Sequence, residues 1–330
     1  MKWLLVPIAL IYFSFHATAQ KDNNYIVQFE KPYNIQFNTW LNDYNFKINP
    51  RQLSNDGKTI AVSPNISLQS GLSFGLKYVT LAFGVQVPGT NNNEKSFGRT
   101  NYFDFGFSYY QSFFGVDIYS RSFSGAYRIV GLDTLADVRP DTKIGSYGLN
   151  LFYNFNHKKF SYRSALSLAE FQKKSSGAFL LMSNIGNRTI DADSSLIPEK
   201  NDSSENYGVL ESLQYLQLWH INIRPGYAYN FCFNDGKWFI SPSAFVGAGW
   251  ASYQIRNLQN SISGNSFEAN AHIKISTGNN HPDYFWNFFL TYDIAINTFP
   301  SNMSVANESG SFGFNIGYRF KKLIPKIKWL

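Results

Sequence analysis

The sequence predicts an all-β protein: a single antiparallel transmembrane β-barrel of about twelve strands that follows an N-terminal signal peptide. Three observations predict this fold. The N-terminus has the order of a secretory signal, apolar and polar residues alternate along most of the chain, and short connections alternate with long ones. The composition agrees, because charged residues make up 15% of the chain, against about 25% in typical soluble domains, and aromatic residues 18%.

Residues 1–19 have the features of a signal peptide. Lys2 supplies a positive start, an apolar run follows from Trp3 to Phe15, and Ala17 and Ala19 are small residues where a signal peptidase cleaves. The run is short for a membrane-spanning helix, which needs about 20 apolar residues. We therefore expect export to the outer membrane, with cleavage near Ala19.

Charge and cysteine content exclude several classes of function. Lys and Arg number 29 and Asp and Glu 22, but the basic residues are scattered, so nucleic-acid binding is not indicated. Cys232 is the one cysteine, and it has no partner for an intrachain disulfide or a paired-cysteine metal site. Motifs of hydrolases, metalloproteases and P-loop enzymes are absent. We expect no metal, no cofactor and no catalysis.

The strand segments have two unlike faces. In residues 311–320 one face is large and apolar and the other small or polar, and residues 78–87, 101–111 and 145–155 repeat the pattern. The apolar face of the first segment holds Phe312, Phe314, Ile316, Tyr318 and Phe320. Such faces are too aromatic and repetitive for one soluble core. They favour a barrel with an apolar exterior and a polar lumen.

Connection lengths predict the topology. Tight turns lie near 77–78, 111–112, 156–159 and 234–237, and long polar connections lie at 88–100, 122–143, 186–213, 254–266 and 297–310. Outer-membrane barrels alternate short periplasmic turns with long outer loops. The expected strands are 33–48, 60–76, 79–87, 101–111, 113–121, 144–155, 159–185, 214–231, 238–252, 267–276, 284–296 and 310–320.

Segment 159–185 is long for one strand. Splitting it at 172–176 would break the alternation of turns, so we expect one long strand; fourteen strands is the main alternative. The expected layout is a signal peptide at 1–19, an N-terminal periplasmic segment at 20–32, the barrel at 33–320 and a basic periplasmic tail at 321–330.

Alternation also predicts which ionisable side chains face the lumen. The candidate lumen cluster is His220, Arg224, Glu268, His272, Lys274, Arg163, Asp117, Asp293 and Arg319. Three interpretations stay open: a salt-bridged filling of a narrow barrel, a constriction along a permeation path, and a histidine-based catalytic site. No nucleophile stands out for the third.

Several short segments carry a resemblance to a known family. They are Pro64-Asn65, Arg139-Pro140-Asp141, Tyr153 to Asn156, Lys159 to Arg163, Gln172 to Gly177 with Phe179 to Leu181, Gly226 to Tyr229, and Trp238 to Ser241. In this order, over about 33–320, the chain resembles the domain-of-unknown-function family 4421. The resemblance implies an exported, barrel-like protein without an assigned activity and supplies no catalytic residues. Ten residues follow Phe320, whereas barrel-insertion signals usually end the chain on an aromatic residue.

The leading functional interpretation is a barrel with a structural or interaction role and a charged, largely filled lumen. A narrow porin or solute channel is the first alternative and a lipid-modifying barrel enzyme the second. The expected partners are outer-membrane lipid and, for a channel, small solutes. Nucleic acid is not an expected partner, and the sequence does not predict an oligomeric state.

Overall fold

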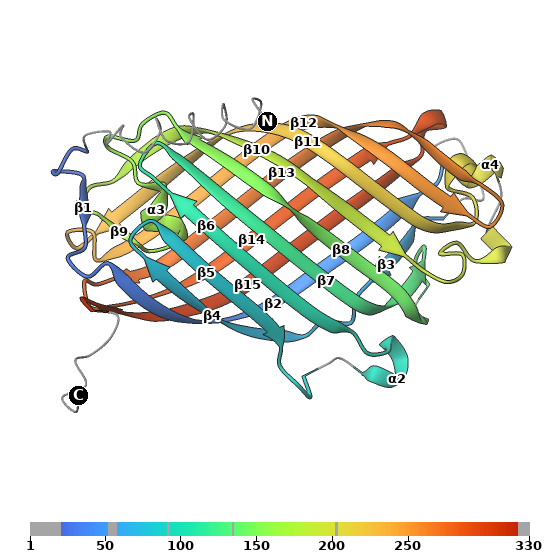
Figure 1. Cartoon of the computed structure of the whole chain (residues 1–330), viewed down its shortest axis with the longest axis horizontal. Coiled ribbons are helices and arrows are strands. Elements are labelled where there is room, and N and C mark those ends of the chain that lie inside the picture. Colours follow the sequence, from blue (N-terminus) through green and yellow to red (C-terminus); the bar gives the residue numbers. More distant parts are fainter. Residues whose placement is uncertain (1–20, 52–57, 91–92, 134, 202–203, 323–330) are drawn as a thin grey trace, which may run out of the picture.

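The chain forms a closed antiparallel β-barrel (Figure 1). The computed structural model describes residues 21–51, 58–90, 93–133, 135–201 and 204–322. The barrel strands are β2 (Tyr33–Asn49), β3 (Ile60–Ser63), β4 (Leu68–Leu76), β5 (Val79–Gln86), β6 (Asn101–Tyr110), β7 (Phe114–Val130), β8 (Asp137–Asn154), β10 (Ser176–Asp191), β11 (Leu213–Phe233), β12 (Trp238–Asn257), β13 (Ser261–Asn280), β14 (Tyr284–Thr298) and β15 (Ser304–Phe320). The β15–β2 pairing closes the ring. The predicted fold class is confirmed.

The wall has its apolar side outward. On β11, Trp219, Ile221 and Ile223 are 49%, 53% and 55% exposed, whereas His220 and Asn222 between them are 3% and 1% exposed. A soluble protein buries the first set and exposes the second. The exposed apolar residues match the lipid-facing band of a transmembrane barrel, and the buried polar residues line its interior.

The number of strands in the wall changes along the barrel axis. We call the end where β2 begins and β15 ends the terminal end, and the opposite end the loop end. Toward the terminal end the described wall has twelve strands, because β4, β5 and β6 stand between β2 and β7. Toward the loop end β3 alone stands there and pairs with both β2 and β7.

A polar seam joins β3 to the shorter strands beside it. The backbone N–H of Asn65 donates to Thr100 Oγ1 at 2.8 Å, and that hydroxyl donates to the carbonyl of Gly125 at 2.8 Å. Gly125 has φ of +91°, and a Cβ there would lie 2.2 Å from the carbonyl oxygen of Arg99. A glycine is therefore needed where β7 leaves β6 and turns toward β3.

Several predicted boundaries are wrong. The predicted loops 122–143, 254–266 and 297–310 are mostly strand, because β7, β8, β12, β13 and β15 extend into them. The exposed residues of these ends include the polar side chains of Ser122, Ser124, Gln254 and Arg256, which resembles a loop in sequence. The predicted strand 60–76 is interrupted between β3 and β4.

The predicted strand 159–185 is also wrong in its first half. Residues 159–175 leave the wall and form α3 (Tyr162–Leu166) and β9 (Glu170–Gln172), and the wall strand β10 begins only at Ser176. The oxygen of Ser161 caps α3 by accepting the N–H of Ser164 at 3.1 Å. The predicted number of twelve wall strands is nevertheless correct, because this segment still contributes one strand, β10, to the wall.

The loop-end plug is the connection 192–212 between β10 and β11, and it closes the loop end with apolar side chains. Its described parts include η2 (Glu199–Asn201), α4 (Ser204–Tyr207) and η3 (Gly208–Leu210). Leu196, Tyr207 and Leu210 are each 0% exposed in one cluster with wall residues. The wall residues of this cluster include Phe46, Ile48, Ile60, Val62, Leu216, Leu218, Ile255 and Val305.

The terminal-end plug consists of residues 155–175 together with β1 (Ile26–Gln28), which pairs with β9. It lies across the terminal end, at the left of Figure 1. Apolar packing is local there. Phe160 and Tyr162 pack with wall residues of one small cluster, and Leu168 packs with Phe239 and Phe285 in another.

Some predictions fall outside the described residues, namely the signal peptide and all of the basic tail beyond Lys322. Within the described residues, no helix has both the length and the apolar character needed to span a membrane.

Candidate functional site

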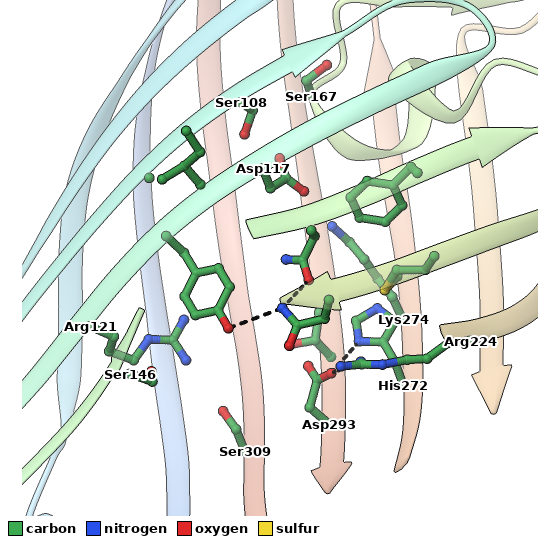
Figure 2. Close-up of a pocket in the computed structure, with 18 of the residues that line it drawn as sticks. Ser108, Asp117, Arg121, Ser146, Ser167, Arg224, His272, Lys274, Asp293 and Ser309 are labelled. Carbon is green, nitrogen blue, oxygen red and sulfur yellow. Dashed lines mark hydrogen bonds and ion pairs between the residues drawn. The ribbon is translucent and has the colours of Figure 1, made fainter. Parts of the chain in front are cut away.

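The chamber is the space inside the barrel between the two plugs. It contains a cavity of about 480 Å³ and a second of about 330 Å³. Ser73, Gly106, Tyr119, Arg121, Lys274 and Thr291 line both cavities. These shared residues mark the junction of the two cavities, and Figure 2 shows the side chains of the larger one.

One group of ionisable residues centres on Asp293. Arg224 Nη1 donates to Asp293 Oδ1 at 3.3 Å, and His272 Nδ1 lies 2.9 Å from the same oxygen (Figure 2). The carboxylate of Asp293 is 46% exposed to the chamber, whereas the Arg224 side chain is 7% exposed. The strand register explains the contact between His272 and Asp293, because these residues are direct partners on β13 and β14.

A second group centres on Glu268, whose side chain is 0% exposed. Arg188 Nη1 donates to Glu268 Oε2 at 2.7 Å, and Asn222 Nδ2 donates to Glu268 Oε1 at 2.7 Å. His220 lies beside this group, with Nε2 2.5 Å from Asn184 Oδ1. A buried ion pair with this many hydrogen bonds keeps its charges satisfied.

Arg121 is only partly satisfied. Its Nη2 lies 3.4 Å from Asp104 Oδ2, and its Nε is buried without a hydrogen-bond partner among the described residues. Asp104 has a better partner in the hydroxyl of Tyr102, which donates at 2.8 Å. Nη1 of Arg121 also has no hydrogen-bond partner among the described residues, and Arg121 lines both cavities.

Lys274 and Asp117 are the two remaining charges. Asp117 accepts the hydroxyl of Tyr110 at 2.5 Å and also bonds Ser108. Lys274 lines both cavities but makes no ion pair and no hydrogen bond within the described residues. Figure 2 accordingly draws no interaction at Lys274.

The structure divides the predicted lumen cluster between two places. Asp117, Arg224, His272, Lys274 and Asp293 line the chamber, and His220 and Glu268 lie beside it. Arg163 and Arg319 lie instead at the terminal end, and Arg163 is on α3 rather than on a wall strand.

At the terminal end, charge and amide contacts attach the plug to the wall. Arg163 Nη1 donates to Glu170 Oε1 at 2.6 Å, and Lys21 pairs with the same oxygen. Asn280 on β13 donates to the carbonyl of Glu170 at 2.8 Å. Arg319 on β15 donates to Asn280 Oδ1 at 2.6 Å and to the carbonyl of Leu168.

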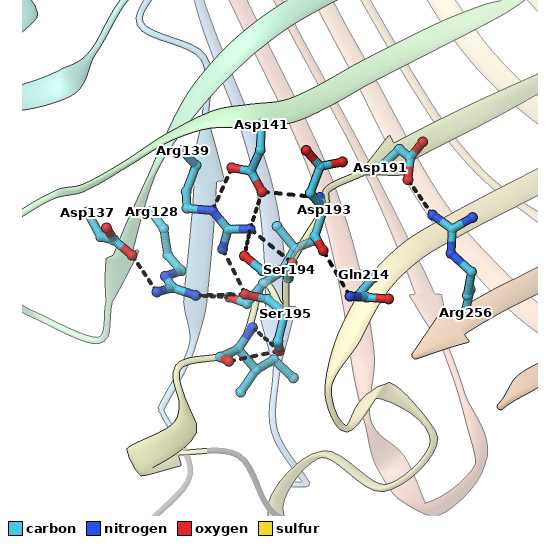
Figure 3. A network of polar contacts seen from close by, with 12 residues as sticks. Arg128, Asp137, Arg139, Asp141, Asp191, Asp193, Ser194, Ser195, Gln214 and Arg256 are labelled. Atoms are coloured by element: carbon cyan, nitrogen blue, oxygen red, sulfur yellow. Dashed lines mark hydrogen bonds and ion pairs between the residues drawn. The ribbon is translucent and has the colours of Figure 1, made fainter. Parts of the chain in front are cut away.

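At the loop end, two arginines hold the first residues of the plug (Figure 3). Arg139 donates to the carbonyls of Ser194 and Ser195 at 2.9 and 2.7 Å, and Asp141 orients its guanidinium through two bonds of 2.9 and 2.8 Å. Arg128 donates to the carbonyls of Ser195 and Leu196 at 3.1 and 3.0 Å. The Arg-Pro-Asp segment therefore has a structural task, which is to anchor the plug.

Sequence reasoning missed Arg188, Lys21 and Glu170. Arg188 shares the inward parity of Asn184 and lies in segment 186–213, which we assigned to a loop. Lys21 and Glu170 are 149 residues apart, and no local pattern signals their contact. Among the described residues, no three His, Cys, Asp or Glu side chains group as a metal site.

Comparison with solved structures finds outer-membrane barrels at low similarity. The outer-membrane protease OmpT from Escherichia coli aligns with a TM-score of 0.42 at 7% identity, over 87% of this chain and 96% of that chain. The β domain of the Bordetella autotransporter BrkA gives 0.40 at 13%, over 88% and 100%. The Pseudomonas putida toluene transporter TodX gives 0.31 at 11%, over 88% and 91%. Similarity at this level carries no argument about activity.

Comparison with curated proteins finds no match. Comparison with protein families finds one, described as a domain of unknown function (DUF4421), over residues 20–320.

Proposed function

The chain belongs to the DUF4421 family, whose function is unknown, and from its geometry we propose that it is a closed, non-conducting barrel of the outer membrane with a structural role. In this proposal the terminal end faces the periplasm, the apolar band contacts lipid, and nucleic acid is not a partner. The observation that carries the proposal is that the chain's own segments cover both ends of the lumen.

The two coverings are attached to the wall by different contacts. The loop-end plug contributes fully buried side chains to the larger apolar cluster. The terminal-end plug adds a buried network around Glu170, whose side chain is 2% exposed. An open porin instead leaves a continuous aqueous path through its lumen.

Planar-bilayer recordings of the purified full-length protein test the proposal. We expect no steady conductance from the wild type. Deletion of residues 193–211 combined with Glu170→Ala should open both ends and produce conducting steps, which shows that the assay detects an open barrel. Conducting steps from the wild type would overturn the proposal and favour a porin.

Gated passage of small solutes is the second candidate, and the chamber is the specific observation that favours it. Cavities of about 480 and 330 Å³ are within or near the usual range of ligand-binding pockets. In this alternative, each plug opens in turn while the other stays closed. Uptake of a small radiolabelled solute into proteoliposomes without steady conductance would support it, and no uptake would leave the structural role.

We also propose that the protein has no catalytic activity. His220 contacts Asn184 and His272 contacts Asp293, and within the described residues neither histidine hydrogen-bonds a serine, threonine or cysteine side chain. A nucleophile needs a base within hydrogen-bond reach. His220→Ala and His272→Ala should leave the lipid profile of the cells unchanged; a change in lipid acylation would count against this proposal.

A further inference from the structure

The geometry points to a binding site for a small organic carboxylate at the cavity junction, with the carboxylate held by Lys274 and the uncharged body against the terminal-end side of the chamber. The inference goes beyond a structural role, since it assigns a ligand class to the interior.

The first argument is the surplus of donors at the junction. Lys274 offers three N–H donors, none of which has a partner within the described residues, and Arg121 uses one long contact of 3.4 Å to Asp104. Both residues line both cavities. An ammonium group with free donors that faces a cavity is a site for an oxyanion, because charge-assisted hydrogen bonds to carboxylates are strong.

The second argument is that the nearby carboxylates already have partners. Asp293 accepts from Arg224 and His272, and Asp117 accepts from Tyr110. The carboxylates face Lys274 across the cavity, but none lies within 4.0 Å of its ammonium group. The positive charge of Lys274 is therefore the one in the described chamber without a direct counter-charge.

The third argument concerns the body of the ligand. The same cavity is lined by Phe152, Tyr162 and Met182, which belong to the apolar cluster beside the terminal-end plug. Apolar walls with a few polar groups that fix orientation are typical of small-molecule sites. An inorganic anion would leave this apolar surface without a contact, so a carboxylate on an aromatic or aliphatic body fits better.

Benzoate is the probe, with benzamide as its uncharged analogue and inorganic phosphate as the bare oxyanion. The full-length mature protein is refolded into detergent micelles with and without each probe, so that entry does not depend on movement of a plug. Calorimetric titration and the thermal unfolding midpoint then measure binding. We expect benzoate to bind saturably and raise the midpoint, and benzamide and phosphate to do neither.

Substitutions locate the site. Lys274→Gln should weaken benzoate binding by about tenfold or more, the size of one lost charge-assisted hydrogen bond, and Lys274→Arg should retain most of it. Lys143→Gln is the matched control, because Lys143 is exposed on β8 and lies away from the chamber. Its affinity for benzoate should equal that of the wild type.

Three results would overturn the inference: equal binding of benzoate and benzamide, binding of phosphate as tight as that of benzoate, or unchanged affinity in Lys274→Gln. The comparison of benzoate with benzamide on the wild type decides the matter even if the variant does not fold. None of these results depends on conductance, so failure here is separate from failure of the proposed closed barrel.

Discussion

The two plugs close the same barrel by opposite physical means. The loop-end plug contributes Leu196, Tyr207 and Leu210 to a broad apolar core, and two arginines hold its first residues. The terminal-end plug has only a five-residue helix and two three-residue strands, and a buried carboxylate, Glu170, joins its parts. Its apolar residues are buried in two small local clusters rather than in one broad core, so polar contacts contribute more to its attachment.

The difference between the plugs predicts which end of the barrel responds to pH. Apolar burial does not change with pH, whereas a buried ion pair depends on the protonation of its members. The terminal-end plug also requires Lys21, near the start of the expected mature chain, to reach Glu170. We therefore expect the attachment of the loop-end plug to be independent of pH and the attachment of the terminal-end plug to depend on pH.

Removal of the Glu170 carboxylate should give the largest effect. Glu170→Ala leaves Arg163 and Lys21 buried without their counter-charge, and breaking a buried pair in this way costs about 3–5 kcal/mol. The terminal-end plug should detach while the wall stays folded. Limited proteolysis should then cut within 155–175, and heat-modifiability on gels should still report a folded barrel. Resistance of this segment to protease would show that charge does not hold it.

Acid should loosen the same plug. Burial raises the pKa of Glu170, but Arg163 and Lys21 lower it more, so the net pKa lies below its ordinary 4.5. A carboxylate with a lowered pKa contributes stability above the pKa of the unfolded state, and this contribution is lost as pH falls through the folded value. Protease sensitivity of 155–175 should therefore rise below about pH 4.5. Glu170→Gln should remove that pH dependence; an identical profile in the variant would contradict the assignment.

Leu196→Ala probes the apolar plug. A fully buried leucine truncated to alanine costs about 2–5 kcal/mol, because transfer and cavity terms add. Protease sensitivity should appear in 192–212 and should be independent of pH between 4 and 8, in contrast to the terminal end. Urea titration in micelles measures the loss of stability. Acid-dependent cleavage here would remove the distinction between the plugs.

Arg139→Lys should have a smaller effect at the loop end. Lysine keeps the charge but cannot reproduce the two bonds to Asp141 together with those to Ser194 and Ser195. Loss of charge-assisted hydrogen bonds costs about 1.5–3 kcal/mol. The same urea titration should show this destabilisation, and a stability equal to the wild type would mean that the apolar core alone holds the plug.

Arg256→Ala should have the smallest effect. Arg256 donates to Asp191 at 2.7 Å, but both side chains are about half exposed. Exposed ion pairs contribute about 0–1 kcal/mol. This variant serves as the matched control for Arg139→Lys, since both remove an arginine contact at the loop end. A loss of stability as large as that of Arg139→Lys would show that burial does not determine the size of these effects.

The sequence predicted the wall better than the plugs. Period-two alternation identifies which side chains face inward, so it placed Arg224, Lys274 and Asp293 on the lumen side without knowledge of the register. Alternation says nothing about a segment that leaves the wall. Residues 159–163 alternate like a strand, and only the capping oxygen of Ser161 distinguishes the helix that follows.

Contacts across the lumen were also beyond the sequence. Arg188 and Glu268 lie on β10 and β13, and Lys21 and Glu170 belong to segments with no shared pattern. These pairs form only when the whole ring closes, because ring closure determines which segments lie inside the barrel. Local residue patterns predict the direction in which a side chain points but not the residue that it contacts.

The shorter strands have a consequence for the surrounding lipid. Strand β5 has 8 residues and β6 has 10, whereas β12 and β13 on another part of the wall have 20 each. A tilted strand needs about 9–11 residues to cross the hydrocarbon layer. The β5–β6 hairpin is at the lower limit of this length, so lipid chains beside it must shorten or tilt to cover its apolar face. In the outer-membrane location that we propose, we therefore expect the annulus of lipid to be thinnest beside this hairpin.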